Sequence, residues 1–307
     1  MTNAVSIRPG RPALPEWVRR LPEYLMIWVP LLLSAAHLVS FSLWTVWISF
    51  TPSTLIPVSG WVGLRNYSSV LASRNWQIAF DNLLLFGSAF VLLSLVTGLA
   101  LAILLDQRVR GENVLRSIFL YPLAVSFVVT GTVWSWLLNP GLGIQKLIHD
   151  LGWASFKFDW LIDRDMAIWT IVIAAIWQSS GFAMALFLAG LRSVDADIIK
   201  AAQIDGAGPV RIYRRIILPS LWPITITVVV IQLQFAISTF DLVRALTNGG
   251  PGIATQLPAL VVYDLMFQRS LLGRGAAAAV LMLLILLAVL LPYAAWRYVQ
   301  RRRAAHA

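Results

Sequence analysis

Six long apolar runs divide this chain, and each is long enough to cross a lipid bilayer. In chain order they cover residues 24–50, 82–105, 118–138, 166–191, 216–240 and 276–296. A helix needs about 20 predominantly apolar residues to span the hydrocarbon core, and 59% of the chain is hydrophobic whereas 12% is charged. The runs therefore predict an all-α polytopic membrane protein with six transmembrane helices. The first run exceeds the apolar core of a cleaved signal peptide and no small-x-small site ends it, so we expect it to be retained.

Basic residues predict how the chain is oriented. We expect an N-terminal tail over residues 1–23, one membrane domain over 24–300 and a basic tail over 301–307. If the N-terminus is cytoplasmic, the inner segments hold 16 of the 24 lysines and arginines and the outer loops hold 8. The positive-inside rule then places both termini in the cytoplasm. This asymmetry accounts for the net charge of +10 without nucleic acid as a partner.

A charged segment separates the fourth and fifth apolar runs. Its ionisable residues are Arg192, Asp195, Asp197, Lys200, Asp205, Arg211, Arg214 and Arg215. Each would cost roughly 2.5–3.5 kcal/mol at the centre of a bilayer, so the loop 192–215 is expected in water. Asp195 is a good N-cap residue for a first short helix, Gly206 can end that helix, and Pro209 suits the first turn of a second.

Two separate motifs carry a resemblance to a known family. Ala201-Ala202, Gly206 and Leu218-Pro219 resemble the EAA signature of membrane subunits of bacterial ATP-binding-cassette (ABC) importers. Phe240-Asp241, followed by Leu-Thr-Asn-Gly-Gly-Pro at residues 246–251, resembles the sugar-importer permeases on the maltose-type side of their heterodimer. The resemblance covers roughly residues 61–297 and is closest to the glucose/mannose-type permeases.

The resemblance implies the permease fold of type I ABC importers, a multi-pass location in the bacterial inner membrane, and a set of partners. These are a second homologous permease subunit, a dimeric ABC ATPase, an extracytoplasmic solute-binding protein, and a sugar or small glycoside as substrate. The loop 192–215 would form the coupling helices that dock on the ATPase. Lys200 occupies the position of the signature glutamate, so the usual charge contact is altered. The residues expected to couple to the ATPase are Asp197, Lys200, Ala201, Ala202, Asp205, Gly206, Arg211 and Arg214.

Polar side chains within the fourth and fifth runs are the candidate substrate site. Amide and hydroxyl groups beside an aromatic ring suit a sugar, and the resemblance places the family's sugar site on the helices before and after the coupling loop. The residues expected to bind substrate are Gln178, Ser179, Phe182, Gln232 and Thr239. Ala236, at another site position, cannot hydrogen-bond a sugar. The alternative for each polar residue is an ordinary interhelical hydrogen bond, worth about 0.6 kcal/mol.

Other classes of function find little support in the sequence. None of the three lysines follows a glycine, so no Walker-type phosphate loop is present and ATP hydrolysis is expected from a partner subunit. The chain has no cysteine and three scattered histidines, so no metal or cofactor is expected. An ion-coupled secondary transporter remains the alternative, although mid-span carboxylates are absent. An intramembrane enzyme is disfavoured because no catalytic grouping appears.

Two loops are expected to contain short amphipathic helices, near residues 67–71 and 143–152. The second could contact a solute-binding protein, or could lie in the membrane interface.

Overall fold

The computed structural model describes residues 16–107 and 109–305, and in these ranges it contains helices and loops without a strand. The chain divides into two units after Trp47, and each is described by itself. The first unit contains one helix, α1 (Glu16–Ser49), which ends just inside the second unit. Every side chain from Leu25 to Trp44 is exposed. Such an apolar helix has to be covered by lipid or by another protein chain.

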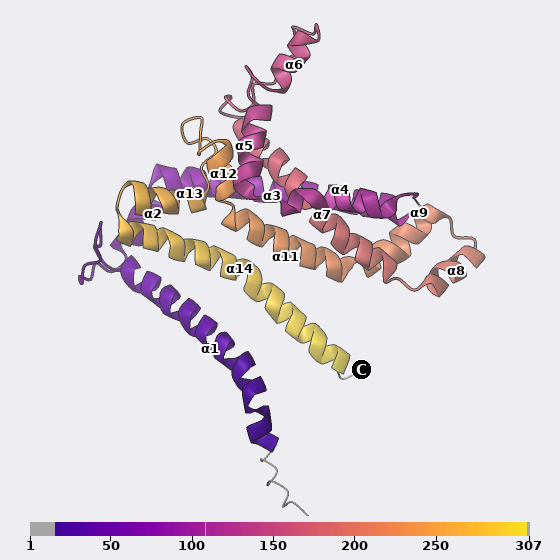
Figure 1. Cartoon of the computed structure of the whole chain (residues 1–307), viewed down its shortest axis with the longest axis horizontal. Coiled ribbons are helices and arrows are strands. Elements are labelled where there is room, and N and C mark those ends of the chain that lie inside the picture. Colours follow the sequence, from indigo (N-terminus) through magenta and orange to yellow (C-terminus); the bar gives the residue numbers. More distant parts are fainter. Residues whose placement is uncertain (1–15, 108, 306–307) are drawn as a thin grey trace, which may run out of the picture. The chain divides into compact units, whose positions relative to one another are not determined.

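The second unit contains the remaining helices (Figure 1). Its long helices are α3 (Arg74–Asp106), α7 (Ala167–Arg192), α11 (Trp222–Ser238) and α14 (Leu272–Ala305). Before α8, the shorter elements are α2 (Arg65–Leu71), α4 (Glu112–Ala124), α5 (Phe127–Leu137) and α6 (Ile144–Asp150). Those that follow are α8 (Ala196–Ile204), α9 (Pro209–Ile212), the π-helical turn η1 (Tyr213–Ile217), α10 (Leu218–Ser220), α12 (Asp241–Leu246), α13 (Pro258–Tyr263) and the π-helical turn η2 (Asp264–Gln268).

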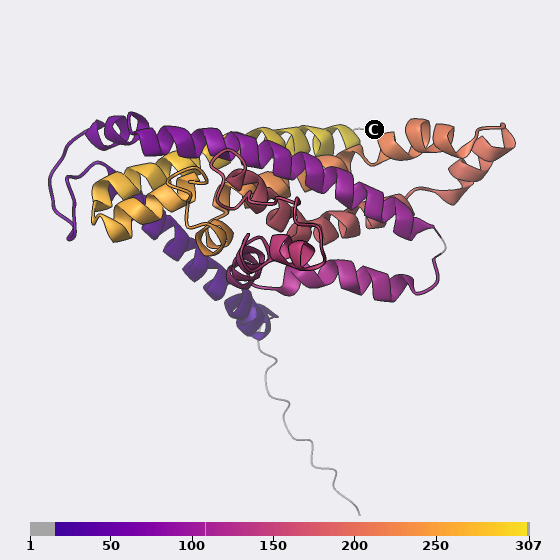
Figure 2. The same cartoon turned by 90° about the horizontal axis from the view of Figure 1, so that it is seen from above.

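Close packing of α3, α4 and α7 builds the core of this unit. α3 and α7 lie side by side in both views (Figures 1 and 2), and α4 packs along α7. Small residues make this approach possible. A Cβ atom on Gly98 of α3 would lie 2.5 Å from the Cβ of Ala183, and one on Gly181 of α7 would collide with the carbonyl oxygen of Phe119 in α4. Small residues at helix contacts are typical of membrane proteins, where packing replaces the hydrophobic drive between helices.

The third apolar run is not one straight span, which corrects the prediction of a single helix over 118–138. α4 and α5 meet at an angle of 98° after Ala124. Pro122, near the end of α4, has no N–H to continue the helical ladder. Ser126 then begins a new helix, because its Oγ accepts a hydrogen bond from the backbone N–H of Val129 at 3.4 Å. α5 therefore leaves the direction of α4 and packs against α12 (Figure 1).

The fifth apolar run is bent as well, by 61° between α10 and α11. Pro219 and Pro223 lie in the first turns of these two helices, as expected for residues that start or kink a helix. By length and composition, four helices (α1, α3, α7 and α14) can each cross a membrane, and the count reaches six when each bent pair is one span.

The other predicted elements differ from the structure mainly at their ends. The fourth run corresponds to α7, and the expected short helices are present as α2 and α6. α3 begins eight residues before Asn82, because Ser73 caps it by accepting from the N–H of Trp76. α14 continues through the basic residues 301–303 to Ala305. Most of the expected N-terminal tail, residues 1–15, lies outside the described residues.

Candidate coupling element and translocation site

The coupling element, residues 195–217, comprises α8, α9 and η1 and projects from one end of the second unit (Figure 1). The expected local signals are confirmed. Asp195 caps α8 by accepting from the N–H of Asp197 at 2.9 Å, Gly206 takes a left-handed φ of 77° after the helix, and Pro209 occupies the first turn of α9. The sequence therefore encodes a helix, a sharp reversal and a second helix, outside the apolar spans.

One face of the coupling element packs on the core of the second unit, and the other face is exposed. Ile212 and Ile217 are buried in a core cluster with Leu188 and Leu191 of α7. Ile204 and Val210 point away from it, with 87% and 79% of their surface exposed. Large aliphatic side chains exposed together on a short projecting element are typical of a surface that another protein covers.

The expected coupling residues are spread over this element. Ala202 is half-buried against the core cluster, whereas the other seven are exposed. Lys200, at the position of the family glutamate, forms an ion pair with Asp197 at 2.9 Å, and both side chains are largely exposed. An exposed pair of this kind contributes at most about 1 kcal/mol. Both charges therefore remain available to a docking partner.

An ion-pair cluster at the base of the coupling element was not expected from the sequence. Arg192, the last residue of α7, binds Glu112 at the start of α4 at 2.6 Å, and its Nε lies 3.8 Å from Asp106 at the end of α3. Tyr213 of η1 lies beside Asp106 and Gln107. The ends of three helices are thus joined at the point from which α8 departs. The individual charges are visible in the sequence, but their meeting depends on the packing of α3 and α4 against α7.

A buried polar group joins α3, α7 and α11. Gln232 of α11 donates to the Oγ of Ser179 in α7 at 3.5 Å, and the Oγ of Ser179 lies 3.5 Å from that of Ser94 in α3. All three side chains are at most 1% exposed. Distances of 3.5 Å are at the outer limit of hydrogen bonding. The two contacts that Ser179 makes to Gln232 and Ser94 are therefore weak. Ser94 was not expected here.

Gln178, next to Ser179, contacts the break between α4 and α5. Its Nε2 donates to the backbone carbonyl of Val125 at 2.7 Å. Its Oε1 and the hydroxyl of Thr130 in α5 are the two buried side-chain polar atoms without a hydrogen-bond partner in the described part of the chain. A buried acceptor without a partner costs about 1–3 kcal/mol.

Thr239 and Phe182 do not join Gln232 in one cavity. Thr239, which is 7% exposed, donates to the carbonyl of Phe235 and lines a cavity of about 60 Å³ together with Phe127 and Asp241. That volume is well below the roughly 300–1,000 Å³ of ligand pockets, so the cavity in this structure is not a formed sugar site. Phe182 is half-buried on α7. The structure thus brings Ser179 and Gln232 together and places Thr239 in a separate small cavity.

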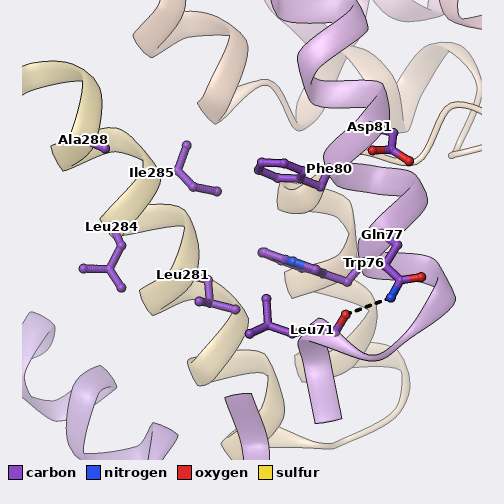
Figure 3. A pocket seen from close by; sticks show the side chains of 9 residues that line it. All are labelled: Leu71, Trp76, Gln77, Phe80, Asp81, Leu281, Leu284, Ile285 and Ala288. Carbon is purple, nitrogen blue, oxygen red and sulfur yellow. Dashed lines mark hydrogen bonds between the residues drawn. The ribbon is translucent and has the colours of Figure 1, made fainter. Parts of the chain in front are cut away.

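A groove with a volume of about 490 Å³ lies elsewhere, between the start of α3 and α14 (Figure 3). Trp76 and Phe80 of α3 point toward Leu281, Leu284 and Ile285 of α14. Its apolar lining suits an acyl chain or another apolar helix. A sugar would find few hydrogen-bonding partners there.

Comparison with known proteins identifies the family. Residues 94–305 match the family model described as "Binding-protein-dependent transport system inner membrane component". A probable ABC transporter permease protein from Pyrococcus horikoshii is 38% identical over 91% of this chain and 96% of its own length. The trehalose/maltose transport system permease protein from Thermococcus litoralis is 32% identical, covering 88% of this chain and 91% of its own.

A solved structure shares the fold. The crystal structure of a bacterial ABC transporter involved in the import of the acidic polysaccharide alginate contains a chain that superposes with a TM-score of 0.79. The match covers 94% of this chain and 97% of the other, at 19% sequence identity. The extent of the family match and the close relatives agree, and the chain belongs to the family of inner membrane components of binding-protein-dependent transport systems.

Proposed function

We propose that this permease forms half of the translocation pathway of an ATP-driven importer for a sugar or small glycoside. A second homologous permease subunit would form the other half, a dimeric ABC ATPase would supply the energy, and an extracytoplasmic solute-binding protein would deliver the substrate. The names of the relatives support the substrate class, since one is a trehalose/maltose permease. The observation that carries the proposal is the coupling element, whose Ile204 and Val210 are exposed while Ile212 and Ile217 anchor it.

The orientation we propose places the coupling element and both termini in the cytoplasm. Two-thirds of the basic residues, 16 of 24, fall on that side. The coupling element is then on the side where ATP is available. The loop that contains α6 and the segment between α12 and α14 are extracytoplasmic in this arrangement.

The mechanism we propose is alternating access, with the movement of the ATPases passed to the helices through the coupling element. The anchored residues of α9 and η1 move with α11, because η1 and α10 lead into it. Arg192 ties α7 to the ends of α3 and α4 through Asp106 and Glu112. A displacement of the coupling element is therefore expected to reach α11 directly, and to reach α3 and α7 through their joined ends. These are the helices that hold Ser94, Ser179 and Gln232.

Substrate binding would accompany separation of these helices. In this structure the amide of Gln232 is paired at 3.5 Å with Ser179, and the Oε1 of Gln178 has no partner among the described residues. Opening would expose Gln178, Ser179 and Gln232 to the pathway, with Phe182 and Thr239 on the same two helical segments. Amide and hydroxyl groups can then replace the water that a sugar loses. Each subunit would supply part of this site.

Uptake of radiolabelled sugar by proteoliposomes containing the assembled complex tests the proposal. Uptake should require the ATPase, the binding protein, and ATP on the side of the membrane that the coupling element faces. A complex lacking residues 195–215 should retain neither the ATPase nor uptake. ATP-independent uptake that follows an ion gradient would contradict the proposal and support a secondary transporter.

A further inference from the structure

Five arginines from five separate segments gather on one end of the second unit. Their positions are Arg65 in α2, Arg74 at the start of α3, Arg244 in α12, Arg269 after η2, and Arg274 in α14. We call this set the arginine surface. These residues lie at the opposite end of α3 from Asp106 and the coupling element, as the element positions in Figure 1 show.

Three adjoining cavities open among these arginines. A cavity of about 270 Å³ is lined by Arg74, Arg269 and Arg274. A second, of about 190 Å³, is lined by Arg244 and Arg269, and a third, of about 160 Å³, by Arg65 and Arg274. Because Arg269 lines the first and second and Arg274 lines the first and third, the cavities form one continuous polar surface.

Positive charge on the arginine surface is mostly uncompensated. Asp264 is the one acidic side chain that lines any of the three cavities, and it pairs with Arg269 at 2.9 Å. In the described part of the chain, no ion pair joins the other four arginines to a carboxylate. The Arg244 guanidinium is held instead by the side chain of Asn248 and by the ring of Tyr263, 4.8 Å from its centroid.

Two of the segments that carry these arginines, α2 and the start of α14, are each hydrogen-bonded to residues 49–53. Asn66 of α2 donates to the carbonyl oxygens of Ser49 and Thr51 at 2.9 and 2.8 Å. The N–H of Gly273, next to Arg274, donates to the carbonyl of Ser53 at 2.8 Å. The guanidinium groups of Arg65 and Arg274 therefore start from defined backbone positions, which lowers the entropy lost when they bind a partner.

In the proposed orientation this surface is extracytoplasmic, and basic residues are not favoured on that side of a membrane protein. Five of the eight basic residues of the outer loops belong to it. The positive-inside rule and the anionic lipids of the cytoplasmic leaflet both favour basic residues on the other side. All five are arginine, whose planar group binds carboxylates in a bidentate manner. Their concentration at one place points to a carboxylate-bearing partner.

We propose that the arginine surface is a docking site for acidic side chains of the extracytoplasmic solute-binding protein. This inference rests on the proposed function, which requires such a protein. Three small open cavities in a row fit several carboxylates presented by a folded partner better than they fit one small anion. Complementary charge across the interface would speed association and orient the partner before apolar contacts form.

The test uses the complete transporter in nanodiscs and the binding protein that supports its uptake. The variant Arg74→Glu/Arg274→Glu reverses two charges on exposed side chains, and Arg164→Glu, an exposed residue of the other outer loop, is the matched control. Association of the binding protein is measured over a range of salt concentrations. The double variant should bind at least about tenfold more weakly and lose much of its salt dependence, whereas the control should match the wild type.

Further measurements separate this inference from the proposed function and from lipid binding. Both variants should co-purify with the ATPase as the wild type does, which also shows that they fold. The milder variant Arg74→Gln/Arg274→Gln should lie between the wild type and the charge reversal. Equal affinity of the double variant and the control would overturn the docking site while leaving the importer intact. A defect that appears only in nanodiscs containing anionic lipid would equally overturn it, in favour of a headgroup site.

Discussion

Replacing Ile204 with alanine should weaken binding of the ATPase without weakening the fold of the permease. The side chain is 87% exposed, so its loss removes almost no packing within this chain. If the ATPase covers it, burial of an isoleucine side chain stabilises the complex by about 1.5–3 kcal/mol. Truncation to alanine removes most of that amount. A loss near 2 kcal/mol corresponds to an affinity about thirtyfold lower.

The assay is titration of the ATPase against permease variants in detergent or nanodiscs, with thermal unfolding measured in parallel. Ile162→Ala is a matched control, because Ile162 is also well exposed, at 64%, in the loop between α6 and α7. The Ile204→Ala variant should bind the ATPase about thirtyfold more weakly at an unchanged Tm, and the control should match the wild type in both measurements. Equal ATPase affinity of the two variants would refute the assignment of the coupling surface.

Three further predictions concern the helices that respond to the coupling element. Arg192→Ala removes the link from α7 to Asp106 and Glu112, so ATP hydrolysis should become partly uncoupled from uptake, while the free energy of unfolding falls by no more than about 1 kcal/mol. The control Lys146→Ala breaks another exposed ion pair and should leave coupling unchanged. Unaltered coupling in both variants would remove Arg192 from the mechanism. Gln232→Ala and Thr239→Ala should raise the apparent KM for sugar at unchanged expression, and wild-type KM in both would remove them from the site. Gly98→Val should lower the free energy of unfolding by about 1–3 kcal/mol, because the larger side chain overpacks against Ala183. The control Gly208→Ala should leave it unchanged, because the added Cβ meets no atom within 4 Å. Similar unfolding curves for these two variants would contradict the close packing of α3 and α7.

The local signals in the sequence predicted the coupling element well. Asp195, Gly206 and Pro209 each act through their immediate neighbours in the chain, and each occupies the expected place in the structure. The membrane spans were predicted from the same kind of information, since apolar composition over about 20 residues is also a local property.

Features that depend on contacts between distant segments could not be predicted in this way. Composition alone does not reveal the 98° turn between α4 and α5, because Pro122 and Ser126 sit within a continuous apolar run. Gln178 remains a predicted substrate residue, and its hydrogen bond to the carbonyl of Val125 at that turn is a contact between distant segments that the sequence does not reveal. The arginine surface likewise combines residues that are more than 200 positions apart, such as Arg65 and Arg274. Only the folded chain brings them together.

The central claim is that the coupling element lies in the cytoplasm and is covered by the ATPase. The chain contains no cysteine, so Ile204→Cys and Ile162→Cys each introduce a unique thiol. A membrane-impermeant maleimide should label Ile162→Cys in intact cells. It should label Ile204→Cys only after permeabilisation, and bound ATPase should then protect that thiol. Labelling of Ile204→Cys in intact cells would contradict the account.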